Sequence, residues 1–347
     1  MRPRPSRRGF VWQRRRSATP RRLAVIGAWV IAGALRAQTA GAQAGTADQA
    51  ALFLLLPISA RAVGMGQSMM ASHGSGDAVW WNPAGIASIS RGDASLHHSQ
   101  SVIGTSEALT IAGASSLLGV AALSANILDF GGEIPAVDNQ GNVVGKILPR
   151  NIALMGTYAR AIGSRVRLGL SYKFVQFRFD CEGLCPALPT TQSSTRALDL
   201  GTQLRLPTRF PLEIGLTVRN IRGRFGGPDE DSPDDGLPTR VQLGIGALYT
   251  IPKEYADDAA LRFSADVIDE LPARRPLPRV GGEFIWEQRA FLRAGYVFAS
   301  GSSESGGPTL GIGFVARRLV IDFARVFAGL SADAGQAPTY LSLRITL

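Results

Sequence analysis

The sequence predicts an all-β fold, a transmembrane antiparallel barrel of about 14 strands. Three observations predict it: polar and apolar residues alternate along many segments, an export leader precedes them, and the connections between them are short and long in turn. A period of two places every apolar side chain of a strand on one face. In a membrane barrel that face contacts lipid, while the polar face lines the lumen.

The first 44 residues predict export. Residues 1–22 contain nine arginines and no acidic residue, and an apolar run follows at Leu23–Leu35. The tripeptide Ala-Gln-Ala at 42–44 has the small-residue pattern of a cleavage site, so 1–44 is interpreted as a signal peptide. The apolar run is shorter than the roughly 20 residues of a membrane-spanning helix.

The leader also accounts for the basic character of the chain. All ten basic residues of positions 1–44 are arginines, and removing them from the 37 in the sequence leaves 27, equal to the number of acidic residues. The mature chain is therefore formally neutral. A nucleic-acid partner, which favours a basic surface, loses its support.

The alternating segments have the length of membrane strands. Arg196–Leu206, Leu212–Ile221 and Arg240–Tyr249 alternate most clearly, and most segments have about 9–13 residues, as a tilted membrane strand requires. In Arg165–Asp180 the apolar residues change face near Val175, which predicts a β-bulge there. The predicted strands are centred near Leu96, Ile111, Ala122, Leu154, Leu170, Leu200, Leu216, Ile245, Ser264, Glu283, Gly295, Ile312, Phe323 and Leu343.

The predicted connections differ at the two ends of the barrel. If the first strand runs outward, the connections at the inner end are nearly all short, for example at 163–164 and 317–318. Six of the seven at the outer end are long and rich in Gly, Pro, Ser or Asp, including 131–149, 181–195 and 270–278. This asymmetry is typical of outer-membrane barrels, whose short turns face the periplasm.

Residues 45–90 do not alternate and carry two ordered motifs before the first predicted strand. The residues of the two motifs are Arg61, Gly64, Met65, Gly66, Asp77, Trp80, Trp81, Asn82, Pro83, Ala84 and Gly85. The segment resembles the N-terminus of the PorV/PorQ family of outer-membrane proteins, which is related to the FadL transporters. The chain departs from the family pattern at Ser72–Gly76, at Ile86 and at Leu347, where an aromatic residue is usual.

The resemblance implies a signal peptide at 1–44, a partly helical hatch at 45–90 that plugs the lumen, and an outer-membrane barrel at 91–347. It implies a non-enzymatic protein without a cofactor, linked to type IX protein secretion. Its expected partners are secretion subunits and secreted cargo, beside outer-membrane lipid and lipopolysaccharide. The alternative is a FadL-like channel that takes up hydrophobic small molecules such as long-chain fatty acids or hydrocarbons.

Other candidate sites have simpler interpretations. Cys181 and Cys185 are predicted to form a local disulfide, because exported proteins mature in an oxidising space. His97 and His98 are adjacent on a predicted strand and point to opposite faces, so they do not chelate one metal. A G-x-S-x-G nucleophile motif does not occur. The acidic segment 228–236 is interpreted as a solvated outer loop.

Overall fold

The structure is a computed structural model of the chain. It describes residues 51–132, 134–138, 140–185, 192–208, 210–221, 223–225, 235–271, 275–298, 306–329 and 334–347. All of them belong to one compact unit, Thr46–Leu347. The predicted signal peptide and the first residues of the predicted hatch lie outside the described residues.

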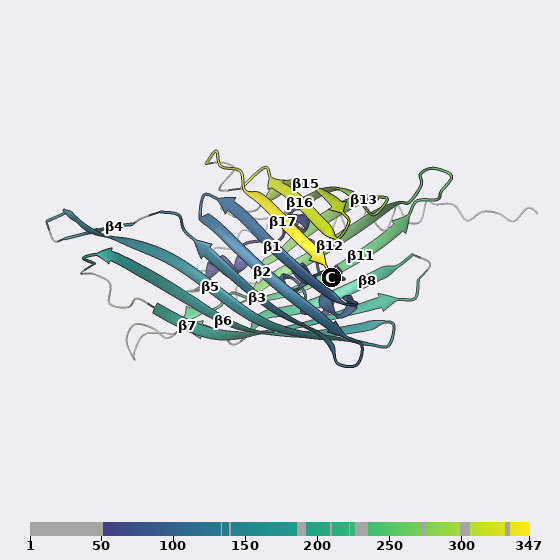
Figure 1. Cartoon of the computed structure of the whole chain (residues 1–347), viewed down its shortest axis with the longest axis horizontal. Helices are drawn as coiled ribbons and strands as arrows, with labels where there is room; N and C mark the ends of the chain where they lie inside the picture. The colour runs from purple at the N-terminus through teal and green to yellow at the C-terminus, as the bar shows by residue number, and fades with distance from the viewer. Residues whose placement is uncertain are drawn as a thin grey trace, which may run out of the picture. The chain divides into compact units, whose positions relative to one another are not determined.

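Within the described residues, fourteen antiparallel strands form a closed barrel (Figure 1). The last strand pairs with the first, and pairing of β3 with β5 completes the ring. The strands of the wall are β1 (Gly92–Ser101), β2 (Gly104–Ser115), β3 (Gly119–Asp129), β5 (Val143–Ile162), β6 (Val166–Gly183), β7 (Gln192–Leu206), β8 (Leu212–Ile221), β11 (Thr239–Thr250), β12 (Ala259–Leu271), β13 (Arg275–Trp286), β14 (Ala290–Val297), β15 (Gly307–Ala316), β16 (Leu319–Val326) and β17 (Thr339–Thr346). The predicted all-β barrel fold is confirmed, and each predicted strand centre falls within one of these strands.

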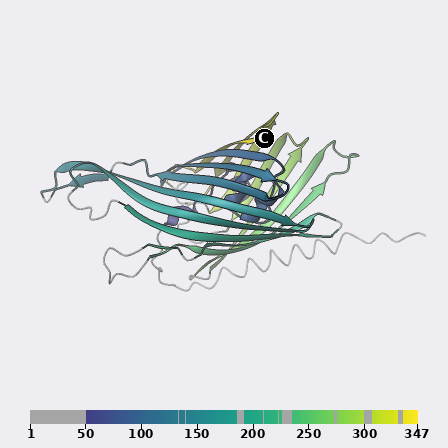
Figure 2. The same cartoon turned by 60° about the horizontal axis from the view of Figure 1, so that its bottom comes forward.

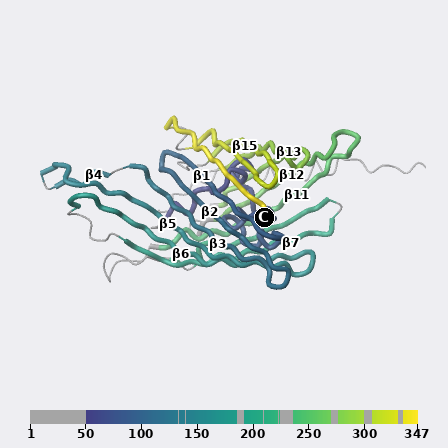
Figure 3. The backbone as a smooth tube through the Cα atoms, viewed as in Figure 1, coloured from purple at the N-terminus to yellow at the C-terminus, as the bar shows by residue number. Residues whose placement is uncertain are grey.

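Three short strands lie outside the ring. β4 (Ile134–Val137) pairs with the start of β5, while β9 (Arg224–Phe225) and β10 (Asp235–Gly236) form a separate pair. In Figures 1 and 3, β4 and the adjoining parts of β5 and β6 protrude past the ends of β1 and β2. We call this protrusion the arm.

The barrel has a short-turn end and a long-loop end. The connections 116–118, 163–165 and 317–318 lie at the short-turn end, and most connections at the other end are longer. The connection predicted to be long at 270–278 is an exception: β12 continues to Leu271 and β13 begins at Arg275. Turn-forming residues there are absorbed into the strands, because the prolines of β13 still pair across to β12.

The walls alternate as the sequence predicts. On β2, Ala108, Thr110 and Ala112 are buried on the lumen side, while Leu109 and Ile111 are exposed on the outside. Exposed apolar side chains on an outer wall are stable only against an apolar medium, as in a lipid bilayer.

The predicted bulge near Val175 is wrong. β6 pairs with β5 and β7 without a register shift through this position. Phe177 and Phe179 therefore face the lumen side, and Phe177 packs edge-on against Phe53 of the N-terminal segment, with ring centroids 6.1 Å apart. The apolar pattern changes face because the lumen itself becomes apolar at this height.

The N-terminal segment fills the lumen. It contains η2 (Leu52–Leu55), α2 (Ala60–Gly64), η3 (Gly76–Trp80) and η4 (Pro83–Ser88). α2 contacts β14–β17, and η4 contacts β5–β7 on the other side of the barrel. Figure 2 shows this purple and dark blue segment among the strands of the wall. None of the described helices has the length and hydrophobicity that a membrane span requires. We call residues 51–89 the hatch.

Candidate functional site

The hatch backbone packs directly against glycines of the wall. Gly66 has a φ of 60°, and a Cβ there would lie 2.3 Å from the carbonyl oxygen of Val280. A Cβ on Gly295 of β14 would lie 2.1 Å from the backbone nitrogen of Gly66, and one on Gly64 would lie 3.0 Å from the Cα of Gly311. Only residues without a side chain allow two backbones to approach this closely.

Polar side chains of the wall bind the hatch backbone. Asp266 of β12 accepts hydrogen bonds from the backbone N–H groups of Met69, at 2.6 Å, and Met70, at 3.0 Å. Three strands along the wall, the amide of Gln203 on β7 donates to the carbonyl oxygens of Met70, at 2.9 Å, and Ser72, at 2.8 Å. These bonds satisfy backbone groups that have no partner in a helix or a strand.

The second hatch motif begins a short helix and fastens it to the wall. The side-chain oxygen of Asn82 accepts a hydrogen bond from the N–H of Ala84, and its amide donates to the carbonyl of Thr202 on β7. Pro83 occupies the first position of η4, where its missing N–H is no loss. A Cβ on Gly85 would lie 2.6 Å from a hatch carbonyl oxygen, so this position also needs glycine.

The two tryptophans and Met65 form the apolar centre of the hatch. All three are buried in one cluster with wall residues of β2, β3 and β5. The indole N–H of Trp80 donates to the hydroxyl of Thr110, at 3.1 Å, and that of Trp81 donates to the carbonyl of Ile58, at 3.1 Å. Both rings therefore have fixed orientations.

A buried ionic cluster ties Arg61 of the hatch to the wall. Its guanidinium lies 3.6 Å from the carboxylate of Glu283, which is 2% exposed. Glu283 also binds Arg262 and Arg293, and Arg293 reaches Asp322 at 2.6 Å. Charges removed from water in this way are stable only while every partner stays in place.

Asp77 of η3 joins this cluster from the hatch side. Burial raises the pKa of its carboxyl, but the positive charges of Arg61 and Arg344 outweigh it. Hydrogen bonds also stabilise the carboxylate: the hydroxyl of Ser59 donates at 2.9 Å, and that of Ser75 donates to the other oxygen. The pKa of Asp77 is lowered to about 2.

The lowered pKa of Asp77 makes the stability of the hatch depend on pH. Because the folded pKa lies below the model value of 3.8, ionised Asp77 contributes stability, on the order of 2 kcal/mol, that is complete above pH 4 and lost as pH falls towards 2. We expect Asp77→Asn to remove that contribution at neutral pH. Urea unfolding between pH 7 and pH 2.5 measures it: the difference between wild type and variant should stay constant down to about pH 4 and then shrink. A difference that grows on acidification would contradict it.

Around η2, the part of the hatch nearest the long-loop end, the lumen is apolar. Ile103, Phe130 and Phe177 of the described wall region pack there, half-buried, beside buried residues. The buried members of this cluster are Ala51, Phe53, Leu128, Ala153, Val175, Ala197 and Leu237. We call this region the apolar chamber. The η2 residues Phe53 and Leu54 occupy much of it.

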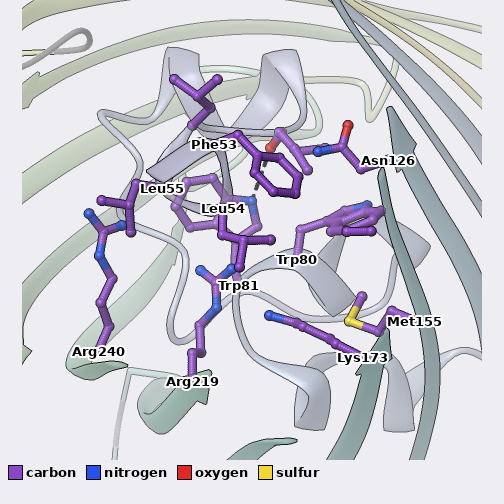
Figure 4. A pocket seen from close by; sticks show the side chains of 13 residues that line it. Phe53, Leu54, Leu55, Trp80, Trp81, Asn126, Met155, Lys173, Arg219 and Arg240 are labelled. Atoms are coloured by element: carbon purple, nitrogen blue, oxygen red, sulfur yellow. Dashed lines mark hydrogen bonds between the residues drawn. The ribbon is translucent and has the colours of Figure 1, made fainter. Parts of the chain in front are cut away.

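A small cavity separates η2 from the two tryptophans. Its volume is about 20 Å³, room for about one water molecule. Figure 4 shows Lys173, Arg219 and Arg240 extending from the wall towards the hatch residues that line the cavity. A larger cavity of about 580 Å³ lies at the short-turn end, and the two share no lining residue. The hatch therefore separates the two ends of the lumen in this conformation.

A β-bulge positions the polar residues on one side of this cavity. Between β7 and β8 the register shifts at Asp199, so that Arg219 and Asn220 both turn inward. Asn220 has a φ of 58°, and its N–H donates to Asp199 at 2.8 Å. The ammonium of Lys173 binds Asp199 at 2.7 Å, whereas the Nε of Arg219 has no hydrogen-bond partner among the described residues. The sequence analysis did not identify these residues, although charges at lumen-facing strand positions were the available signal.

The arm reverses the polarity of the barrel wall. Towards the lumen side, Ile134 of β4 pairs with Ile147, and Pro149 pairs with Phe179. The opposite face carries the charged pair Lys146 and Glu182 and the pair Arg150 and Arg178. The apolar face of the arm thus continues into the apolar chamber, and its charged face points away from the lumen.

Of the other residues considered in the sequence, the two cysteines lie away from the hatch, and His97 borders it through Ser342, whose hydroxyl accepts a hydrogen bond from the N–H of Ala60 at 2.8 Å. Cys181 and Cys185 form a disulfide at the arm, with Cys181 inside β6 rather than in a loop. His97 is buried and shares a hydrogen bond with Ser342, while His98 faces outward beside Glu107. Among the described residues, no group of three potential metal ligands occurs.

No family model matches the sequence, and no curated protein is detectably similar to it. Solved structures do match. The toluene transporter TbuX of Ralstonia pickettii has a TM-score of 0.50 and 12% identity, over 82% of this chain and 97% of that one. A FadL homologue of Pseudomonas aeruginosa has a TM-score of 0.52 and 12% identity, over 84% and 99%. The CymD monoaromatic hydrocarbon channel has a TM-score of 0.51 and 12% identity, over 84% and 98%.

At this identity the likeness concerns the fold alone. It covers most of both chains. The resemblance to PorV/PorQ proteins stays a prediction, since none of the matches reported above is described as a protein of that family. The chain has the fold of the FadL-like outer-membrane transporters.

Proposed function

We propose that this protein is a non-enzymatic outer-membrane channel that takes up hydrophobic small molecules, with its short turns in the periplasm. The observation that carries the proposal is the apolar chamber around η2, at the long-loop end of the lumen. A barrel that served only as a scaffold has no need of a lumen that changes from polar to apolar at one end. Ligand sites for small molecules are mostly apolar with a few placed polar groups, as here.

The ligand enters along the apolar face of the arm and binds where η2 now lies. A cavity of about 20 Å³ is far below the roughly 300–1,000 Å³ of a ligand site. Phe53 and Leu54 must therefore move aside, and the ligand replaces their apolar contacts. Passage to the short-turn end requires a further movement of the hatch, because the cavity ends at Trp80 and Trp81.

The charged wall of the cavity favours a ligand with a carboxylate. Lys173, Arg219 and Arg240 line it, and Asp199 is the carboxylate that binds the first two. The buried Nε of Arg219 lies 3.8 Å from Asp199 but makes no hydrogen bond within the described residues, so it is a donor for an oxygen of the ligand. A long-chain fatty acid satisfies both sides of the site, whereas a hydrocarbon satisfies only the apolar one.

Tryptophan quenching tests this proposal. Beyond the leader, the sequence has three tryptophans, Trp80, Trp81 and Trp286, and only the last lies outside the hatch. In a Trp286→Phe background, we expect a brominated long-chain fatty acid to quench the hatch tryptophans saturably. Lys173→Met should weaken binding of the acid about tenfold and leave binding of the matching brominated alcohol unchanged. Quenching that never saturates would contradict a binding site.

The secretion-linked function implied by the hatch motifs remains a separate prediction. It requires partner subunits or exported cargo at the long loops, and neither is needed for uptake. Affinity purification of the protein from its native outer membrane separates the two. Secretion subunits in stoichiometric amount would favour the secretion function, and a bound fatty acid without them would favour uptake.

A further inference from the structure

The outer wall contains a groove that neither the lumen nor the hatch explains. It lies across β2, β3, β5 and β6, on the face that points away from the lumen, and has a volume of about 490 Å³. The residues on the outward face that line it are Ile111, Ala121, Leu123, Gly156, Tyr158, Leu170 and Tyr172. We call it the lipid groove. All of its outward side chains are apolar or aromatic, which is unlike the charged lining of the lumen cavities.

The strand register explains the shape of the lipid groove. One row across the four strands is Ile111, Leu123, Gly156 and Tyr172, and the next row towards the short turns is Gly113, Ala121, Tyr158 and Leu170. Directly paired residues share one face. The small residues Gly156 and Ala121 are therefore diagonal neighbours and form the floor between larger side chains, and Gly113 lies beside Ala121 in the second row. A Cβ at Gly113 or Gly156 would meet nothing within 4 Å.

The side chain of Arg160 provides a positive charge at the short-turn end of the lipid groove. Arg160 is the next outward residue of β5 after Tyr158, and it is exposed. Within the described residues it makes no ion pair. The adjoining β2–β3 turn exposes Leu117 and Leu118, which are 76% and 66% accessible. A positive charge beside an apolar turn matches the boundary between acyl chains and phosphates at a bilayer surface.

We propose that the lipid groove holds one acyl chain of a phospholipid from the leaflet at the short-turn end, with its phosphate at Arg160. The stretch from Gly156 to Arg160 spans about 13 Å along β5, which accommodates a large part of one chain. The volume falls within the range of small-molecule sites, roughly 300–1,000 Å³. A guanidinium binds phosphate by charge-assisted hydrogen bonds, which are strengthened where water is scarce. The site is independent of the molecule that the lumen carries.

Filling the floor of the lipid groove tests the proposal. The full chain, processed in the outer membrane and extracted in a mild detergent, is compared by native mass spectrometry as wild type and Gly156→Leu. We expect wild type to retain one phospholipid per barrel and to rebind added phosphatidylglycerol. Gly156→Leu should lower the one-lipid adduct about tenfold. Gly282→Leu is the matched control: it also faces outward, but lies on β13, and a Cβ there is 3.9 Å from its nearest neighbours.

Two further variants test the groove if Gly156→Leu does not fold, and test the role of Arg160. Ala121→Leu fills the other half of the floor and should reproduce the loss if Gly156→Leu does not fold, which a heat-modifiability gel reports. Arg160→Gln should weaken binding of phosphatidylglycerol but not of diacylglycerol, which has no phosphate. Equal retention of lipid by Gly156→Leu and Gly282→Leu would overturn the proposal, and so would a wild-type spectrum showing a lipid-free barrel or a dimer of the chain.

Discussion

Replacing Gly66 with valine is expected to push the hatch away from the wall and open the lumen. A branched side chain disfavours the φ of 60° at this position, and its Cβ would lie 2.3 Å from the carbonyl oxygen of Val280 and 2.7 Å from the nitrogen of Tyr296. Both neighbours are backbone atoms of paired strands, so neither can yield. Strain and overpacking together should destabilise hatch docking by about 2–5 kcal/mol.

Planar-bilayer conductance measures the result directly. A barrel of fourteen strands with a displaced hatch has an aqueous lumen, so Gly66→Val should conduct ions steadily while wild type stays closed. Gly282→Val is the control, since this glycine lies on the outward face of the wall and a Cβ there would make only ordinary contacts at 3.9 Å. If Gly66→Val stayed closed and as stable as wild type, the close contact between Gly66 and the wall would not be what fixes the hatch.

Glu283→Gln is expected to have the largest effect of any single charge removal described above. The variant keeps the size of the side chain but leaves Arg61, Arg262 and Arg293 with one carboxylate fewer in a buried cluster. Loss of one partner from a buried ion pair costs about 3–5 kcal/mol, because the remaining charges stay out of water. Since Arg61 belongs to the hatch, the loss should also loosen the hatch.

Urea unfolding followed by hatch tryptophan fluorescence measures this change. Glu107→Gln provides the comparison, because Glu107 forms an exposed pair with His98. Its removal should change stability by less than about 1 kcal/mol. Similar losses for the two variants would mean that the cluster around Glu283 is well hydrated and does not hold the hatch.

The barrel could be predicted because every strand has one face against lipid and the other against the lumen, which imposes the same alternation of apolar and polar residues on each. A period of two and unequal connections are local signals, and they placed all fourteen strands. The rule fails on β6, where Phe177 faces the lumen without a bulge, because the apolar chamber replaces polar solvent at that height. The bulge at Asn220 was missed, although two consecutive polar residues, Arg219 and Asn220, interrupt the alternation between Val218 and Ile221.

Of the candidate site, only the residues that belong to the hatch could be predicted from the sequence. Two sequence motifs mark the glycines and tryptophans of the hatch, but not the wall residues that receive them. Glycines at lumen-facing positions of neighbouring strands, such as Gly281, Gly295 and Gly311, were a usable signal for backbone contact. Lys173 and Glu283 meet their partners only through pairing between distant strands, which a single sequence does not reveal.

Pairing of β1 with β17 has a consequence for biogenesis. The hatch lies directly before β1, yet α2 is held by β14–β17, the last strands to be synthesised. The pairing of β1 with β17 that closes the barrel therefore also completes the wall that surrounds the hatch. If the barrel closes before the hatch docks, the hatch must enter through the short-turn end, where β1 begins, and in either order α2 has its complete docking surface only once β14–β17 are in place.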